Sequence, residues 1–501
     1  MATSAWLINE AGAIALQSDP DTPYRWSDPR LMTYRFLLLA AVLATHPATA
    51  DDLLAIYDLA LQHDPVSRQA AANRDSALQT RPQGIARLLP QVAVTGRMNR
   101  DWVYSRLSNV QLCGRQSCDD RTLSLTGQAA IAGARRAEFW DSSASMTLQQ
   151  PVYHHEYWVQ LSQSDNQIAR AQANYEASVQ DLAVRTATAY FNLLYAEDSL
   201  DFSNAQLKGV ERQLEQAKAR FDVGLIAITD VNEAQAGYDQ ARASVLKSEN
   251  DVDNAREALR EIIGSYVGDI DPLNQEFALK PPQPGNIEDW SDRAAEQNLS
   301  IIAALNQQEV AKKNIELQFA GHLPTVDIVG AIGFSDNNRP NGVSAESGVI
   351  GMQVNVPLLQ GGGVNARVTQ ARHDLEAAQE ALEGQRRLVQ KQIKVAYRGI
   401  HSNISQAEAY KAAVTSSESA LEATEAGFEV GTRTMVEVLT TQTNLYNAKR
   451  NYAKARYDYI TSSLTLKQVA STLQREDLEL VNGWLTRSAA AKSRPAEPKE
   501  N

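Results

Sequence analysis

The amino-acid sequence contains one order of segments twice, and this internal duplication limits the possible folds more than any other feature. Residues 221–231, FDVGLIAITDV, return 207 positions later as FEVGTRTMVEV in residues 428–438. A Leu-Pro-x-Val motif at residues 89–92 returns at residues 323–326. The chain therefore contains two copies of one structural unit.

A proline-rich linker separates the two copies. The stretch KPPQPG at residues 280–285 cannot continue a helix, because proline lacks the backbone N–H and clashes with the preceding turn. We assign the first repeat to residues 51–269, the linker to 270–290 and the second repeat to 291–473. Residues 474–501 follow, and their end, rich in Lys, Pro and Glu, is predicted to be disordered.

Each repeat predicts a very long helix followed by a heptad-patterned helix. No proline occurs between Pro151 and Gly224 or between Pro357 and Gly431, and at ~1.5 Å per residue each stretch would span roughly 110 Å as a helix. Apolar and small residues then recur at three- and four-residue spacing from Val231 and from Val436, as in a coiled coil. A soluble periplasmic coiled-coil adaptor also fits this pattern and remains the alternative.

Four segments alternate between apolar and polar residues, which favours half-buried strands. They comprise residues 90–104, 143–151, 325–334 and 350–356. Strands of about 9–12 residues with one apolar face suit a transmembrane barrel, although a soluble sandwich shows the same alternation. Aromatic residues flank the segments, as an interfacial belt requires. They are Trp102, Tyr104, Phe139, Trp140, Tyr153, Tyr157 and Trp158.

Four strands cannot close a barrel in lipid, where open strand edges are not tolerated. Two, three or four chains would supply 8, 12 or 16 strands, so the pattern predicts an oligomer. A wide barrel shared between chains and continuing into long helices would enclose a pore.

The N-terminal region predicts export from the cytoplasm. Residues 32–50 combine Arg35, an apolar stretch and an Ala-x-Ala cleavage site, which is typical of a secretory signal peptide. We expect residues 1–31 to precede the natural start at Met32, and the mature chain to begin at Asp51. The net charge of −12 argues against nucleic-acid binding, which needs clustered Lys and Arg.

No motif supports an enzyme or a metal site. His154-His155-Glu156 places adjacent side chains on different faces of a helix and lacks a third ligand at suitable spacing, so we expect no metal there. Gly361 to Gly363 follows a strand and is interpreted as a flexible corner. Nucleophile-elbow, zinc-protease and CxxC motifs do not occur, and we expect no cofactor.

The motif order resembles that of the TolC family of outer-membrane efflux and type I secretion channels. The motifs that carry the resemblance lie at Ala55–Ala60, Ala187–Leu194, Arg220–Val231, Val430–Thr434 and Leu445–Lys449. The resemblance implies an α+β membrane protein, with a homotrimeric 12-stranded barrel of four strands per chain in outer-membrane lipid. A 12-helix α-barrel would cross the periplasm, surrounded by an equatorial belt built from the linker and the chain after Leu473.

The resemblance also implies a passive exit duct with defined partners. Such channels dock on a periplasmic adaptor (membrane fusion) protein and on an inner-membrane pump of the RND, ABC or MFS class. The Val223-Gly224 and Val430-Gly431 turns would gather at the periplasmic tip, where the adaptor docks.

In family channels, polar bonds between helices, here called the latch, close this tip at rest. Matching the motifs places the latch on residues around the two turns. Thr229, Asp230 and Arg433 fall on latch positions, and Phe428 replaces a frequent tyrosine, so its hydroxyl bond is absent. The family's channel is narrowed by two acidic positions. Glu437 retains the first of these carboxylates, whereas Thr440 stands at the position of the second. One acidic ring instead of two predicts weaker cation selectivity and weaker block by multivalent cations.

Helix capping explains some of the same residues without a gate. Asp230-x-x-Glu233 and Thr434-x-x-Glu437 each have the form of a capping box, and Gly224 and Gly431 suit the residue that follows a helix. Capping and latching are compatible. Arg433 has no role in capping, which favours the latch there.

Both cysteines fall in a 28-residue extension of the first strand hairpin, which the family fold places outside the cell. Oxidising conditions there favour a disulfide between Cys113 and Cys118 over two free thiols.

Overall fold

The computed structural model describes residues 52–106, 134–274, 277–337 and 344–486. The predicted leader at residues 1–50, both cysteines and the chain end from residue 487 lie outside the described residues.

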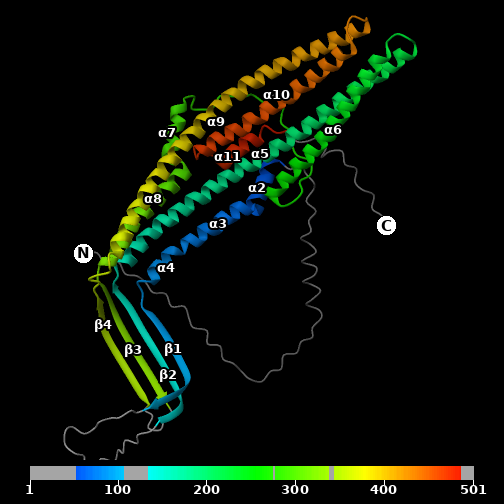
Figure 1. The fold of residues 1–501 in the computed structure, drawn as a ribbon. Helices are drawn as coiled ribbons and strands as arrows, with labels where there is room; N and C mark the ends of the chain where they lie inside the picture. Colours follow the sequence, from blue (N-terminus) through cyan, green and yellow to red (C-terminus); the bar gives the residue numbers. More distant parts are fainter. Residues whose placement is uncertain (1–51, 107–133, 275–276, 338–343, 487–501) are drawn as a thin grey trace, which may run out of the picture. The chain divides into compact units, whose positions relative to one another are not determined.

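The strands form one antiparallel sheet in the order β1-β2-β3-β4 (Figure 1). Their bounds are β1 Gln91–Arg106, β2 Ala134–Tyr153, β3 Thr325–Asn337 and β4 Ala345–Asn355. Each strand pairs with the next one along the chain, so within one chain β1 and β4 each leave an edge without a partner. Because open strand edges are not tolerated in lipid, these edges are where copies of the chain would meet in a membrane barrel.

Apolar side chains share one exposed face of the sheet, as their alternation predicts. Val94 lies opposite Met146, which in turn lies opposite Ile332 on the next strand. All three side chains are exposed in the single chain, as is Ile350 on β4. An exposed apolar band on the sheet is the surface that lipid would cover.

The second strand begins earlier than predicted, because β2 covers Ala134–Tyr153 whereas the alternation predicted residues 143–151. The first strand, predicted over residues 90–104, covers Gln91–Arg106, and the ladder between the two continues without interruption to Arg106 opposite Ala134. Cross-strand pairing, which the alternation of a single strand does not reveal, extends this hairpin toward the inserted segment.

The two long helices and the two heptad helices form as predicted. Their bounds are α5 His155–Asp222, α6 Ile228–Ile263, α9 Gly363–Glu429 and α10 Met435–Val469. The buried face of α6 includes Ala234, Ala241 and Val245, which are members of the predicted heptad series. In Figure 1, α5 with α6 and α9 with α10 form two helical hairpins. No helix in the described ranges combines the length and apolar character needed to span a membrane.

Shorter helices precede each strand hairpin and follow the second repeat. They are α2 Leu53–His63, α3 Pro65–Leu78, α4 Thr80–Ala86, α7 Ile287–Gln297, α8 Leu299–Phe319, the 3-10 turn η1 Ala320–His322, and α11 Arg475–Asn482. The linker contacts the segment after α11, where the backbone N–H of Asn274 donates to the Trp484 carbonyl at 2.9 Å. The two segments predicted to build the belt therefore lie together.

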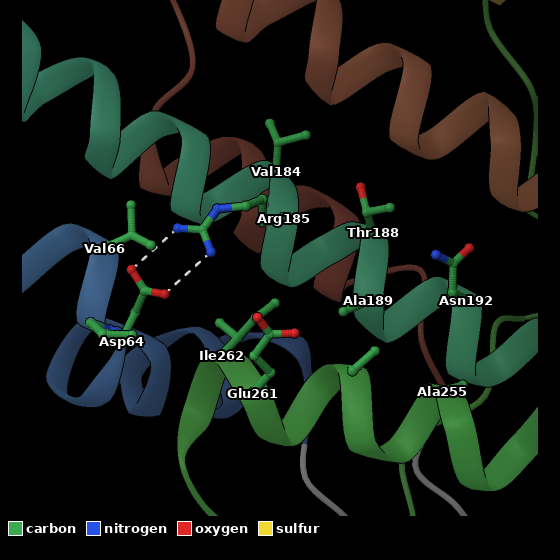
Figure 2. Close-up of a pocket in the computed structure, with 12 residues that line it drawn as sticks. Asp64, Val66, Val184, Arg185, Thr188, Ala189, Asn192, Ala255, Glu261 and Ile262 are labelled. Atoms are coloured by element: carbon green, nitrogen blue, oxygen red, sulfur yellow. Dashed lines mark hydrogen bonds and ion pairs between the residues drawn. The ribbon is translucent and has the colours of Figure 1, made fainter.

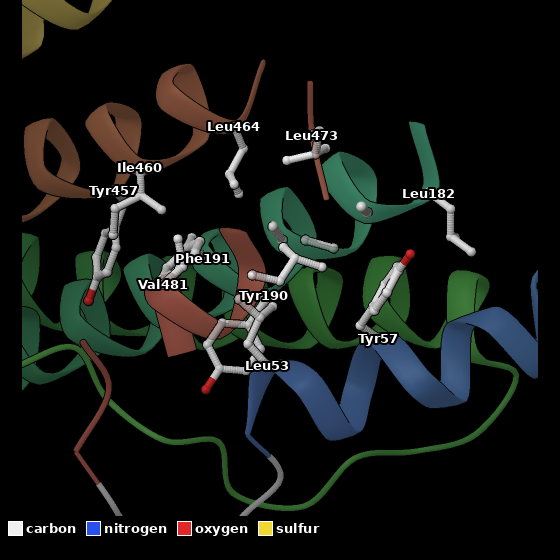
Figure 3. Packing of buried hydrophobic residues seen from close by; sticks show 14 of the residues in the cluster. Leu53, Tyr57, Leu182, Tyr190, Phe191, Tyr457, Ile460, Leu464, Leu473 and Val481 are labelled. Atoms are coloured by element: carbon white, nitrogen blue, oxygen red, sulfur yellow. The ribbon is translucent and has the colours of Figure 1, made fainter. Parts of the chain in front are cut away.

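One hydrophobic core joins both repeats (Figure 3). Phe191 of the first repeat stacks on Tyr457 of the second with ring centroids 5.8 Å apart. Leu53 and Ile460 are fully buried in the same cluster. Each such side chain contributes about 1.5–3 kcal/mol on burial, so the repeats form one cooperative unit.

Candidate functional site

Each long helix ends in the same left-handed glycine turn. Gly224 has φ 76° and Gly431 has φ 78°, a conformation that costs other residues steric strain. After α5, the N–H groups of Gly224 and Leu225 donate to the carbonyls of Phe221 and Arg220, both at 2.9 Å. The same two bonds recur after α9, so both turns are Schellman motifs.

The starts of the following helices differ. Thr434 caps α10, and its N–H donates to the Glu437 carboxylate at 2.8 Å, which confirms the predicted capping box. In α6 the cap position is Ala227, which has no capping side chain, and the Asp230 carboxylate accepts the Ala227 N–H at 3.3 Å. The prediction of Asp230 as a cap residue is therefore wrong. The helix begins three residues earlier than a start capped by Asp230 would, which places Asp230 in its first turn.

A small apolar cluster, here called the tip cluster, lies beside the two turns and is separate from the main core. Its buried members are Leu214 and Ala217 of α5, Ala234 of α6 and Met435 of α10. Phe428 of α9 packs against it half-buried. The tip cluster thus connects both helical hairpins of one chain near the residues predicted for the gate.

Arg433 folds back on its own hairpin. Its guanidinium donates to the Glu437 carboxylate at 2.9 Å. Its side chain crosses the last turn of α9 at Gly427, where an added Cβ would lie 2.6 Å from the Arg433 Cγ. Within the described part of one chain, Arg433 forms neither a hydrogen bond nor an ion pair with Asp230.

Hydrogen bonds favour the charged form of Glu437. The backbone N–H of Thr434 and the guanidinium of Arg433 hold the pKa of the Glu437 carboxyl below its ordinary 4.5. The site therefore presents a carboxylate that stays ionised in moderately acidic solution. Thr440, at the second constriction position, donates its hydroxyl to the Val436 carbonyl at 2.7 Å.

Apolar side chains at the two turns face solvent. Val223 is 70% exposed, Val430 is 76% exposed and Leu225 is 74% exposed. Thr229 is exposed as well. Exposed aliphatic residues gathered at a turn favour a contact with another protein.

Arg220 approaches the other turn and was not among the predicted site residues. Its guanidinium carbon lies 5.2 Å from the centroid of the Phe428 ring. Arg220 and Gly427 are 207 positions apart, so they occupy equivalent positions in the two repeats. Comparing the repeats position by position would have identified both as residues in which the two turns differ.

A cavity of about 350 Å³ lies between α3, α5 and α6 (Figure 2). At its wall, Arg185 donates to both oxygens of the buried Asp64 carboxylate, each at 3.2 Å. Burial would raise the pKa of Asp64, but the bonds from Arg185 and the Ser67 N–H outweigh burial and lower it. Because Asp64 also caps α3, this pair fixes helix packing and offers no group to a ligand.

The two adjacent histidines have separate partners near the strand ends. His154 lies 3.1 Å from both oxygens of Asp327 on β3, and His155 lies 2.9 Å from Glu316 on α8. In the part of the chain that the structure describes, no three acidic, His or Cys side chains form a group able to hold a metal ion.

The fold is that of a class of solved structures, the outer-membrane channels. The structure matches the crystal structure of the Campylobacter jejuni CmeC outer membrane channel with a TM-score of 0.69. The match covers 94% of this chain and 98% of that chain at 15% identity, so it shows a shared fold.

Sequence comparison then supplies the family. The outer membrane efflux protein profile matches residues 56–265 and 290–472. Outer membrane protein TolC of Vibrio cholerae is 36% identical over 456 residues, covering 90% of this chain and 98% of TolC. Alkaline protease secretion protein AprF of Pseudomonas aeruginosa is 28% identical over 457 residues, covering 90% of this chain and 91% of AprF. The chain belongs to the outer membrane efflux protein family.

Family membership confirms the main predictions from the sequence. The protein is a channel of the outer membrane that extends into the periplasm, and it is neither an enzyme nor a soluble adaptor. The family forms trimers, and three chains with four strands each give the predicted 12-stranded barrel.

Proposed function

We propose that the two glycine turns form the gate of this outer-membrane exit duct. The observation that carries the proposal is the joining of both helical hairpins beside their turns. The tip cluster connects α5, α6 and α10 with few buried side chains, whereas the main core is extensive. A small contact at the end of long helices can separate at little cost, which a gate requires.

Charged and polar residues around the tip cluster would close the gate between chains. Asp230 and Thr229 begin α6, and Arg433 begins the return of the second hairpin. The Arg433 side chain is 57% exposed, so its remaining N–H groups are accessible to a neighbouring chain. An Asp230 to Arg433 bond between chains would be charge-assisted and contribute on the order of 1–3 kcal/mol.

The exposed apolar turns would receive the rest of the export system. Val223 and Val430, with the neighbouring Leu225, offer aliphatic surface to a periplasmic adaptor protein. An inner-membrane pump of the RND, ABC or MFS class would supply the energy, since the channel is passive. Membership in an efflux family and similarity to AprF, whose name denotes protease secretion, support export of drugs, proteins or both.

The gate is tested by removing its charged pair. The variant Asp230→Ala with Arg433→Ser should raise the closed-state conductance of single trimers in planar lipid bilayers, because the bond between chains is lost. An unchanged closed-state conductance would overturn the latch assignment.

A matched control removes a similar ion pair far from the turns. Lys247 donates to Asp251 at 3.0 Å on the surface of α6. The variant Lys247→Ser with Asp251→Ala makes the same chemical change, and its conductance should equal that of the wild type. A rise in the control would attribute the effect to net charge and contradict the gate.

A further inference from the structure

We propose that Arg220 is a positioning residue of the gate, which holds the end of α5 to the end of α9 through the face of the Phe428 ring. The inference rests on the proposed gating function and adds a contact within one chain to the latch between chains. A guanidinium within about 6 Å of an aromatic centroid is attracted by the negative face of the ring. The observed 5.2 Å satisfies this condition.

The surroundings favour this contact over an ion pair. Arg220 makes no ion pair within the described residues, although carboxylates are frequent on these helices. It is half-buried and follows the fully buried Ala217 by three residues, which puts its stem on the face of α5 that covers the tip cluster. Because the stem covers apolar surface, the charged end is partly shielded from water, and the attraction to the ring is stronger there.

Phe428 offers only its ring to this contact. Without a hydroxyl it can neither donate nor accept a conventional hydrogen bond. It packs against the tip cluster from α9, whereas Arg220 belongs to α5, so the contact connects the two hairpins across 208 positions of sequence. Any opening motion that moves one hairpin away from the other must break it.

The test is a double-mutant cycle on the open-to-closed ratio of single trimers in planar lipid bilayers. Arg220→Gln removes the charge, Phe428→Leu removes the ring but keeps an apolar side chain, and the third variant carries both changes. From the usual strength of such contacts, each single variant should raise the open-to-closed ratio about two- to fivefold. The double variant should rise no further than the stronger single variant, because one contact is lost in all three.

Two further variants separate this contact from general effects. Phe428→Tyr keeps the ring and should retain the wild-type conductance. Arg212→Gln removes an exposed charge from the same helix, where Arg212 contacts only the Lys208 carbonyl, and should also leave conductance unchanged. Each variant is first shown to form an SDS-resistant trimer.

The outcomes distinguish this inference from the gate itself. If the Asp230 and Arg433 variant opens the channel but the Arg220 and Phe428 variants do not, the role of Arg220 is overturned and the gate stands. If none of these variants opens the channel, the gate proposal fails. Additive effects of Arg220→Gln and Phe428→Leu would also overturn the contact, because they would act separately.

Discussion

The two turns have the same backbone conformation, but their arginines lie at different positions. Both are Schellman motifs with glycine in the left-handed conformation. At equivalent positions, the first turn has Arg220 before its glycine and Ile226 after it, whereas the second has Gly427 before and Arg433 after. One arginine therefore contacts the opposite hairpin, and the other pairs with its own.

This difference shows how a duplicated unit acquires separate roles. The hydrogen bonds of the turn involve only the backbone, so they tolerate different side chains around the glycine. Gly427 permits the close approach of Arg433, and a side chain like that of Arg220 at the same position would obstruct it. We infer that Arg220 of the first turn provides cohesion within the chain, whereas Arg433 of the second turn provides the contact with Asp230 of a neighbouring chain.

The largest expected effect comes from disturbing the left-handed backbone conformation that the two turns have in common. Gly224→Ala and Gly431→Ala should each destabilise the protein by about 1–2 kcal/mol, because alanine resists the left-handed conformation. An added Cβ meets no atom within 4 Å at either position, so the loss of stability comes from backbone strain and not from a steric clash with neighbouring residues. The temperature at which SDS-resistant trimers dissociate should fall equally in both variants. A clearly unequal fall would show that the two turns are not equivalent.

The helix caps should respond with opposite signs. Thr434→Ala removes the cap of α10 and should cost about 1 kcal/mol, whereas Ala227→Ser supplies a missing cap to α6 and should stabilise by about 0.5–1 kcal/mol. Trimer dissociation temperature measures both changes. Thr424→Ala is the matched control, since that hydroxyl donates to the Ala420 carbonyl at 2.7 Å in the interior of α9. A loss of stability in Ala227→Ser would contradict the cap assignment at α6.

The smallest expected effect concerns acid titration at the second turn. Because the pKa of Glu437 is lowered, its negative charge is present above that pKa and is lost only when the pH falls through it. Cation selectivity, measured as reversal potential in a salt gradient, should therefore persist somewhat below pH 4.5. In Arg433→Gln one of the stabilising bonds is lost, so selectivity should disappear at a higher pH.

Glu437→Gln provides the reference for this titration. It removes the ionisable group, so the selectivity that depends on Glu437 should be absent throughout the acid range. If Arg433→Gln and the wild type lose selectivity at the same pH, the Arg433 bond does not influence the carboxylate during conduction.

Local patterns were sufficient to predict the helices and their ends. Stretches without proline, ending at Gly224 and Gly431, specify long helices because backbone hydrogen bonding continues until a residue favours its termination. The Thr434 and Glu437 cap was predictable for the same reason, since it lies within four residues. Asp230 was misplaced because two helix starts, three residues apart, are compatible with the same local motif.

Contacts between distant segments could not be predicted in this way. The full length of β1 and β2 depends on pairing across the hairpin, and the Arg220 contact joins residues from different repeats. Their formation depends on the relative position of whole elements, which local spacing does not encode.

Repeat, periodicity and turn residues were thus enough to establish the elements, their order and the need for several chains. Those properties follow from local sterics and from the alternation of apolar and polar residues. The tertiary structure decided which side chains meet at the two turns, because burial in the tip cluster and the space beside Gly427 select among contacts that are all chemically possible. Two nearly identical motifs therefore carry different interactions in the folded protein.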